Sequence, residues 1–173
     1  MTMTSTTGAV VFTDLVGFTQ FTAESGDEAA MRILAAQDRI VRPRLSGGAR
    51  IVKELGDGLM LFFADPCDAV ATMLDVLDGF SAAADADELP LWVRIGAHWG
   101  APKRRGLDLI GHDANVAARI VDVASPGELL VSDPLRTAGA FDAVEFDEIG
   151  PVMMKGLTEP VSLYRVERSM TRR

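Results

Sequence analysis

The sequence is poor in cysteine, histidine and long hydrophobic runs, and each scarcity excludes a class of protein. The single cysteine, Cys67, cannot form an intrachain disulfide, and neither His98 nor His112 has a partner at zinc-site spacing. The strongest hydrophobic run, residues 59–64, is far shorter than the roughly 20 residues of a membrane-spanning helix. The first residues also lack the charged and then apolar pattern of a signal peptide. We therefore expect a cytoplasmic protein without direct membrane contact.

Positive charge is scarce as well. Lysine and arginine together number 17 against 25 aspartates and glutamates, which gives a net charge of −8. Nucleic acid binding relies on an excess of positive charge, so this balance argues against a nucleic acid partner. With 48% hydrophobic residues, the 173-residue chain suits one globular domain. We place that domain at residues 8–168, between an N-terminal tail at 1–7 and a C-terminal tail at 169–173.

Strand and helix patterns alternate along the chain in an order that predicts the fold. A buried strand over 9–12, a helical pattern over 28–45, two strands around Gly56-Asp57-Gly58, a helix from Pro66 and a strand over 91–99 give the order β-α-β-β-α-β. Pro43 is expected to fray the first of these helices. A helix over 111–123 and strand patterns over 128–132, 144–149 and 161–166 follow. We predict an α+β fold, an α/β sandwich, with a ferredoxin-like βαββαβ core and C-terminal helix and strand additions.

Two carboxylates are expected to meet in this topology. If the first strand and the second are parallel and the second forms a hairpin with the third, Asp14 and Asp57 lie at one edge of the sheet. Paired carboxylates at strand ends suit hard cations such as Mg²⁺. Taken singly, Asp14 can also be read as a cap of a helix near Gly17, and Asp57 as a turn residue.

Four segments carry a resemblance to a known family. They are VFTDLVGFT at 11–19, KELGDG at 53–58, DLIGHDANVAAR at 108–119 and KG at 155–156. Their order and spacing resemble the class III adenylyl and guanylyl cyclase catalytic domain over nearly the whole chain. The resemblance implies that Asp14 and Asp57 hold two Mg²⁺ or Mn²⁺ ions, with the backbone carbonyl of Leu15 as a further ligand.

The same resemblance assigns the remaining polar residues. Asn115 would orient the ribose and Arg119 would stabilise the transition-state phosphoryl charge, while Lys155 would contact the terminal phosphates. Lys53 and Asp108 would read the purine, because a lysine donor and an aspartate acceptor match the N1 and N6 edge of adenine. The alternatives are a solvated helix face for Asn115 and Arg119, and solvated surface positions for the three others.

The resemblance therefore implies an adenylate cyclase that converts ATP to 3′,5′-cyclic AMP and pyrophosphate. It further implies a head-to-tail homodimer with two composite sites at the interface. A guanylate or mixed-specificity cyclase and a catalytically silent nucleotide-sensing module remain as alternatives. The connection over residues 99–106 is shorter than the usual one of the family, and its three basic residues, Lys103, Arg104 and Arg105, are expected to form a solvated turn. Any regulatory or sensor domain would lie outside this chain.

Overall fold

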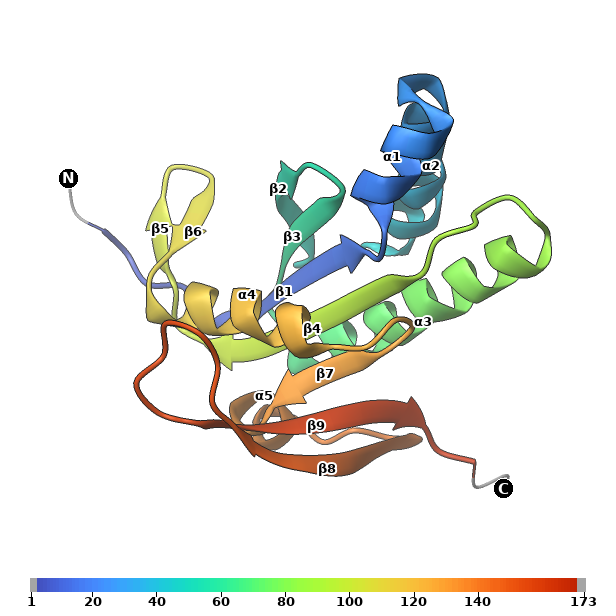
Figure 1. The fold of residues 1–173 in the computed structure, drawn as a ribbon. Helices are drawn as coiled ribbons and strands as arrows, with labels where there is room; N and C mark the ends of the chain where they lie inside the picture. The colour runs from blue at the N-terminus through green and yellow to red at the C-terminus, as the bar shows by residue number, and fades with distance from the viewer. Residues whose placement is uncertain (1–2, 171–173) are drawn as a thin grey trace.

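A computed structural model describes residues 3–170 and contains one large sheet (Figure 1). The strand order is β2-β3-β1-β4-β7-β9-β8. Its members are β1 (Gly8–Leu15), β2 (Arg50–Leu55), β3 (Gly58–Phe63), β4 (Val93–Gly100), β7 (Leu129–Ser132), β8 (Val144–Val152) and β9 (Val161–Arg168). The first four strands are antiparallel to their neighbours, in the order β2-β3-β1-β4. This arrangement confirms the predicted ferredoxin-like core and its C-terminal additions.

Helices cover both faces of the sheet. Alternate residues of β1 point to opposite faces, and Ala9 and Val11 pack in the cluster that includes buried residues of α2 (Asp27–Val41) and α3 (Pro66–Asp85). Val10 packs on the other face with Ala114 and Ala117 of α4 (His112–Val123). Figure 1 shows α4 lying alone across this second face of the core strands. Between residues 3 and 170, no helix is both long and apolar enough to cross a bilayer.

Most element boundaries differ from the predicted ones by a few residues, and the differences have simple causes. The strand predicted over 9–12 continues through Asp14 to Leu15, because β4 pairs with it along its whole length. The helix predicted over 28–45 ends at Val41, and a 3₁₀ turn over Arg42–Arg44 contains Pro43, which supplies no backbone N–H to an α-helix. Two short helices, α1 (Phe18–Ser25) and α5 (Asp133–Ala138), were not delimited because their patterns span few turns.

The three basic residues over 103–105 form a hairpin strand rather than the expected turn. Lys103–Arg105 forms β5, which pairs with β6 (Asp108–Ile110), so the prediction of a solvated turn was wrong for the backbone. All three basic residues are nevertheless exposed. A three-residue strand without a buried face has no hydrophobic alternation by which a sequence could reveal it. Ser5 also forms a bridge with Lys103, while residues 1–2 and 171–173 of the predicted tails lie outside the described residues.

Candidate active site

Asp14 and Asp57 meet where β1 ends beside the β2–β3 turn. The pairing of Thr13 with Leu59 places that turn against the last residues of β1. The backbone N–H of Leu15 donates to Asp57 Oδ2 at 3.1 Å. The helix cap considered for Asp14 does not occur, because α1 has Gly17 at its cap position and no side-chain cap. The structure thus brings the two predicted carboxylates together where β1 ends beside β3, with the Leu15 N–H bonded to Asp57.

Glycine on each side of Asp57 makes this close approach feasible. Gly56 has a φ of 67°, a left-handed conformation that favours glycine. A Cβ atom on Gly58 would lie 2.8 Å from the carbonyl oxygen of Thr13, so a side chain there would push the turn away from β1. The hydroxyl of Thr13 in turn accepts the N–H of Leu59 at 3.2 Å. The Gly-Asp-Gly sequence therefore fixes Asp57 against the end of β1.

The charges around this pair favour a bound cation. Burial and, after it, the negative charge of Asp14 raise the pKa of the Asp57 carboxyl. Across residues 3–170, no group of three or more histidine, cysteine, aspartate or glutamate side chains could enclose a metal. Two carboxylates with open positions fit Mg²⁺, which commonly takes one or two carboxylates and completes its shell with water and substrate phosphates. The donor set therefore suits a divalent cation that is shared with a phosphorylated substrate.

Arg94 belongs to the same cluster and was missed in the sequence. Its Nε and Nη2 atoms lie 2.9 and 2.8 Å from Asp14 Oδ2, and its Nη1 donates to the backbone oxygen of Asp122 at 3.0 Å. Arg94 stands opposite Asp14 in the β1–β4 register. The available signal was a charged residue inside the otherwise buried start of β4, between Val93 and Ile95. The Arg94 guanidinium thus forms an ion pair with Asp14 within the single chain.

Lys53 and Asp108 form a second polar pair, at a distance of 55 residues along the chain. Lys53 Nζ lies 2.9 Å from Asp108 Oδ1 and 3.0 Å from Oδ2. The hydrogen bond from Lys53 lowers the pKa of the Asp108 carboxyl. Arg50 holds the β5–β6 hairpin close to β2 by donating to the backbone oxygen of Leu107 at 3.1 Å. Both side chains of the pair are partly exposed, so a ligand can reach them.

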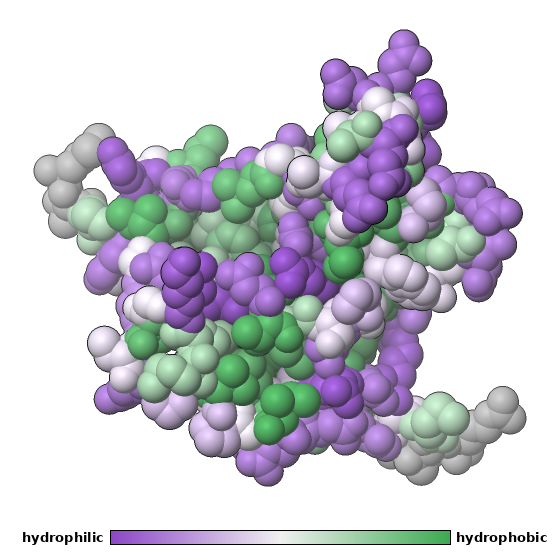
Figure 2. Space-filling view, viewed as in Figure 1, coloured by the Kyte–Doolittle hydropathy of each residue, from purple (hydrophilic) through white to green (hydrophobic). Residues whose placement is uncertain are grey.

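Asn115 and Arg119 lie on the outward side of α4. The neighbouring residues Ala114, Val116 and Ile120 are buried, whereas Asn115 is exposed. Arg119 Nη1 contacts Asp122 Oδ2 at 3.2 Å, and both side chains remain about half exposed. Figure 2 shows a hydrophilic strip along α4 with hydrophobic residues beside it. Within one chain, this exposure also agrees with the alternative that Asn115 and Arg119 belong to a solvated helix face.

Lys155 is exposed in the loop between β8 and β9. The preceding residue, Met154, is buried in a cluster with Val116 and Ile120 of α4, so the loop is anchored on the helix that carries Asn115 and Arg119. Met153, in contrast, is 62% exposed.

His98 and Cys67 form hydrogen bonds within the fold, away from the candidate site. The Nδ1 atom of His98 lies 2.7 Å from Ser132 Oγ, and Nε2 lies 3.0 Å from Asp113 Oδ1. Burial lowers the pKa of this imidazole, which links β4, α4 and the end of β7. Cys67 Sγ donates to the backbone oxygen of Ala140 at 3.2 Å. Neither residue contacts the two polar pairs.

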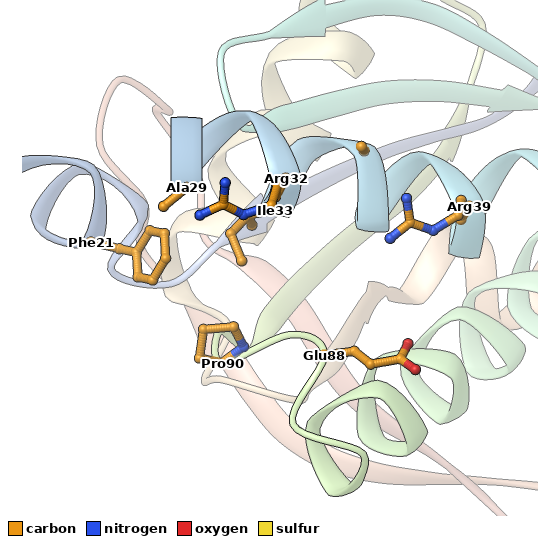
Figure 3. Close-up of a pocket in the computed structure, with 8 residues that line it drawn as sticks. Phe21, Ala29, Arg32, Ile33, Arg39, Glu88 and Pro90 are labelled. Carbon is orange, nitrogen blue, oxygen red and sulfur yellow. The ribbon is translucent and has the colours of Figure 1, made fainter. Parts of the chain in front are cut away.

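A separate pocket of about 670 Å³ lies between α2 and the segment that precedes β4 (Figure 3). Arg32 and Arg39 of α2 line one side, and Glu88 and Pro90 line the other. The pocket contains none of the seven polar residues singled out in the sequence. We therefore place the candidate active site at the Asp14–Asp57 pair.

Comparisons with known proteins agree on one family. The profile of the adenylate and guanylate cyclase catalytic domain matches residues 3–168. A pH-sensitive adenylate cyclase of Mycobacterium tuberculosis is 31% identical over 94% of this chain, and an uncharacterised protein of the same species is 30% identical over 95%. The chain spans only 41% and 42% of the lengths of these relatives.

Solved structures share the fold at low sequence identity. The adenylyl cyclase CyaB from P. aeruginosa has a TM-score of 0.80 at 24% identity, covering 98% of this chain and 97% of that one. The guanylate cyclase domain of a Catenaria anguillulae protein in complex with GTP also has a TM-score of 0.80, at 19% identity, covering 98% of this chain and 100% of that one. Given the family match over nearly all of its length, the chain belongs to the adenylate and guanylate cyclase catalytic domain family.

Proposed function

We propose that the chain is an adenylate cyclase that converts ATP to 3′,5′-cyclic AMP and pyrophosphate. The observation that carries the proposal is the Asp14–Asp57 pair, held by the Leu15 N–H at the end of β1. Its arrangement fits a cation-dependent reaction on a nucleoside triphosphate. The similarity to a relative named as an adenylate cyclase supports the choice of reaction.

The carboxylates, together with the backbone carbonyl of Leu15, would hold two Mg²⁺ or Mn²⁺ ions. Such ions would lower the pKa of the ribose 3′-hydroxyl and neutralise the triphosphate charge. Arg94 is bonded to Asp14, so a cation bound at that carboxylate would share it with the guanidinium or displace the guanidinium. A planar guanidinium also matches phosphate oxygens, which gives Arg94 a partner in the loaded site.

The reaction is an in-line displacement at the α-phosphate. The ribose 3′-oxygen forms a bond to the α-phosphorus, the bond to the pyrophosphate oxygen breaks, and the hydroxyl proton passes to water. Arg119 stabilises the charge that develops on the phosphoryl oxygens, and Asn115 orients the ribose. Lys155 contacts the terminal phosphates. The protein thus contributes position and charge rather than a covalent intermediate.

We also propose that the active unit is a head-to-tail homodimer with two composite sites. Asn115 and Arg119 face outward from α4, and hydrophobic residues remain exposed on the same face of the molecule (Figure 2). In such a dimer, the α4 residues of one subunit complete the Asp14–Asp57 site of the other.

The proposal includes a cytoplasmic location. Because the chain spans about two fifths of its curated relatives, it also includes a regulatory or sensor domain outside this segment.

The base preference follows from the Lys53–Asp108 pair. Lysine can donate to adenine N1 and aspartate can accept from the N6 amino group, whereas guanine presents the opposite pattern. We expect purified protein with Mn²⁺ to form cyclic AMP with a kcat/KM at least about tenfold higher than for cyclic GMP formation, because mismatched polar groups stay unpaired. Equal or greater use of GTP would favour the guanylate or mixed-specificity alternative. Folded protein without product from either nucleotide would favour the silent nucleotide-sensing module.

The double substitution Lys53→Glu with Asp108→Cys tests this assignment of the base contacts. It should lower kcat/KM for ATP by about tenfold or more, because the new side chains face the adenine edge with unmatched groups. Steady-state kinetics with ATP provide the measurement, and Lys103→Gln, at an exposed hairpin residue, matches the net charge change of the double variant. Unchanged ATP kinetics in the double variant would show that the pair does not read the base.

A further inference from the structure

Gln37 makes one unusual contact behind the candidate active site. It lies on α2, and only 3% of the residue is exposed. Its Nε2 donates to the backbone oxygen of Asp57 at 3.2 Å. Among the residues that the structure describes, Gln37 Oε1 is the buried side-chain polar atom without a hydrogen-bond partner. The buried Gln37 amide therefore holds the backbone carbonyl of Asp57, the residue proposed to bind metal.

The orientation of this amide follows from chemistry. Rotating the amide by 180° would place Oε1 against the Asp57 carbonyl oxygen, and two acceptors cannot form a hydrogen bond. A buried acceptor without a partner lowers stability. Methionine has a similar length and would fill the space without that cost. The advantage of glutamine at this position therefore lies in what its N–H group holds.

The Asp57 turn needs such a restraint because the two carboxylates repel each other. The Leu15 N–H holds the Asp57 carboxylate, and Gln37 holds its backbone carbonyl. Ile33 and Val41, one turn on either side of Gln37, are buried in the main core. Helix α2 thus gives the turn a rigid support.

We propose that Gln37 is a positioning residue for the metal site: its N–H fixes the Asp57 turn so that both carboxylates keep the spacing that a divalent cation requires. This inference deepens the proposed function, on which it relies for the role of Asp57. Gln37 itself touches neither substrate nor metal. Its effect is therefore expected on cation affinity rather than on turnover at saturating cation.

The substitution Gln37→Met removes both the donor and the unpaired acceptor. We expect a thermal midpoint without metal that equals or exceeds that of the wild type. Direct Mn²⁺ binding, measured by electron paramagnetic resonance of free Mn²⁺, should weaken about three- to tenfold, the factor that the loss of one hydrogen bond produces. The Mn²⁺ concentration for half-maximal activity should rise by the same factor, while kcat at saturating Mn²⁺ stays near the wild-type value.

Three further variants separate positioning from packing. Gln37→Asn keeps the amide but withdraws it by one methylene, so it should bind Mn²⁺ as weakly as Gln37→Met. Gln37→His supplies an N–H at a similar reach and should restore part of the affinity. Gln20→Met changes an exposed glutamine that bonds only Glu24 within α1, and it should leave Mn²⁺ binding unchanged.

The outcomes distinguish this inference from the proposed function. Wild-type Mn²⁺ affinity in Gln37→Met overturns the positioning role. Parallel losses of stability and affinity in the Met and His variants also overturn it, because they indicate packing alone. Absence of cyclic product from wild type that binds Mn²⁺ would contradict the proposed function and leave the binding comparison intact. Absence of Mn²⁺ binding by the wild type would overturn both.

Discussion

Replacing Asp57 by asparagine is expected to reduce cyclase turnover about a hundredfold or more. Asparagine keeps an oxygen that can accept the Leu15 N–H, so the turn should remain in place. It removes one of the two negative charges that a bound cation requires. Asp57→Asn therefore tests the loss of a cation ligand charge while the fold of the turn is kept.

The stability of Asp57→Asn should move in the opposite direction to its activity. Burial and the Asp14 charge raise the pKa of Asp57 in the folded chain, so ionised Asp57 destabilises the metal-free fold. This cost grows as the pH rises from the ordinary aspartate range through the raised folded pKa, and it is absent where the group is protonated in both states. At neutral pH the metal-free variant should therefore unfold at the same temperature as the wild type or higher.

Thermal unfolding with and without Mn²⁺, together with a cyclic AMP assay, provides the measurement. Mn²⁺ should raise the midpoint of the wild type but leave that of Asp57→Asn nearly unchanged. The substitution Asp142→Asn, at an exposed carboxylate in the loop before β8, serves as the control and should behave as wild type. A properly folded Asp57→Asn chain that cyclises ATP at a rate close to wild type would contradict the metal role.

A mixture of Asp14→Ala and Arg119→Ala proteins should regain activity that neither variant has alone. In a composite site, Asp14 comes from one subunit and Arg119 from the other, so each mixed dimer holds one doubly damaged site and one intact site. With free exchange, about half of the dimers are mixed, and recovery should approach roughly a quarter of wild-type activity. Incomplete exchange would lower that value in proportion.

The matched control for this experiment is a mixture of Asp14→Ala with Asp57→Ala. Both carboxylates belong to the same chain's pair, so every site in a mixed dimer lacks one of them and no recovery is expected. Subunit exchange is checked separately with two differently labelled wild-type chains. If exchange occurs and the Asp14 and Arg119 variants still fail to complement, both residues act in the same chain's site and the interfacial proposal is wrong.

The core of the fold and the proximity of Asp14 and Asp57 could be predicted from the sequence, because both depend on local signals. Gly56-Asp57-Gly58 between two strand patterns specifies a hairpin, and the β-α-β-β-α-β order places its tip beside the end of β1. The Lys53–Asp108 pair was assigned by family resemblance. The structure adds that these side chains bond each other directly in the single chain.

The contacts that could not be predicted join segments without a common local pattern. Arg94 reaches Asp14 across 80 residues through the β1–β4 register, which hydrophobic periodicity does not specify. Gln37 occupies a buried position of α2, where the helical pattern favours an apolar residue. The sequence does not show which group its amide bonds, because the partner, the Asp57 carbonyl, lies on a different element. The strand Lys103–Arg105 is exposed throughout and carries no pattern. These features depend on tertiary pairing.

The most direct test of the proposed activity is product analysis with the purified chain, Mn²⁺ and ATP. An in-line attack of the 3′-hydroxyl on the α-phosphate predicts cyclic AMP and pyrophosphate in equal amounts, with the formation of both reduced about a hundredfold or more in Asp57→Asn under the same conditions. Mass spectrometry identifies the nucleotide, and an enzymatic assay quantifies pyrophosphate. Folded, Mn²⁺-binding wild-type chain that leaves ATP unchanged, or that releases ADP and phosphate instead, would contradict the account.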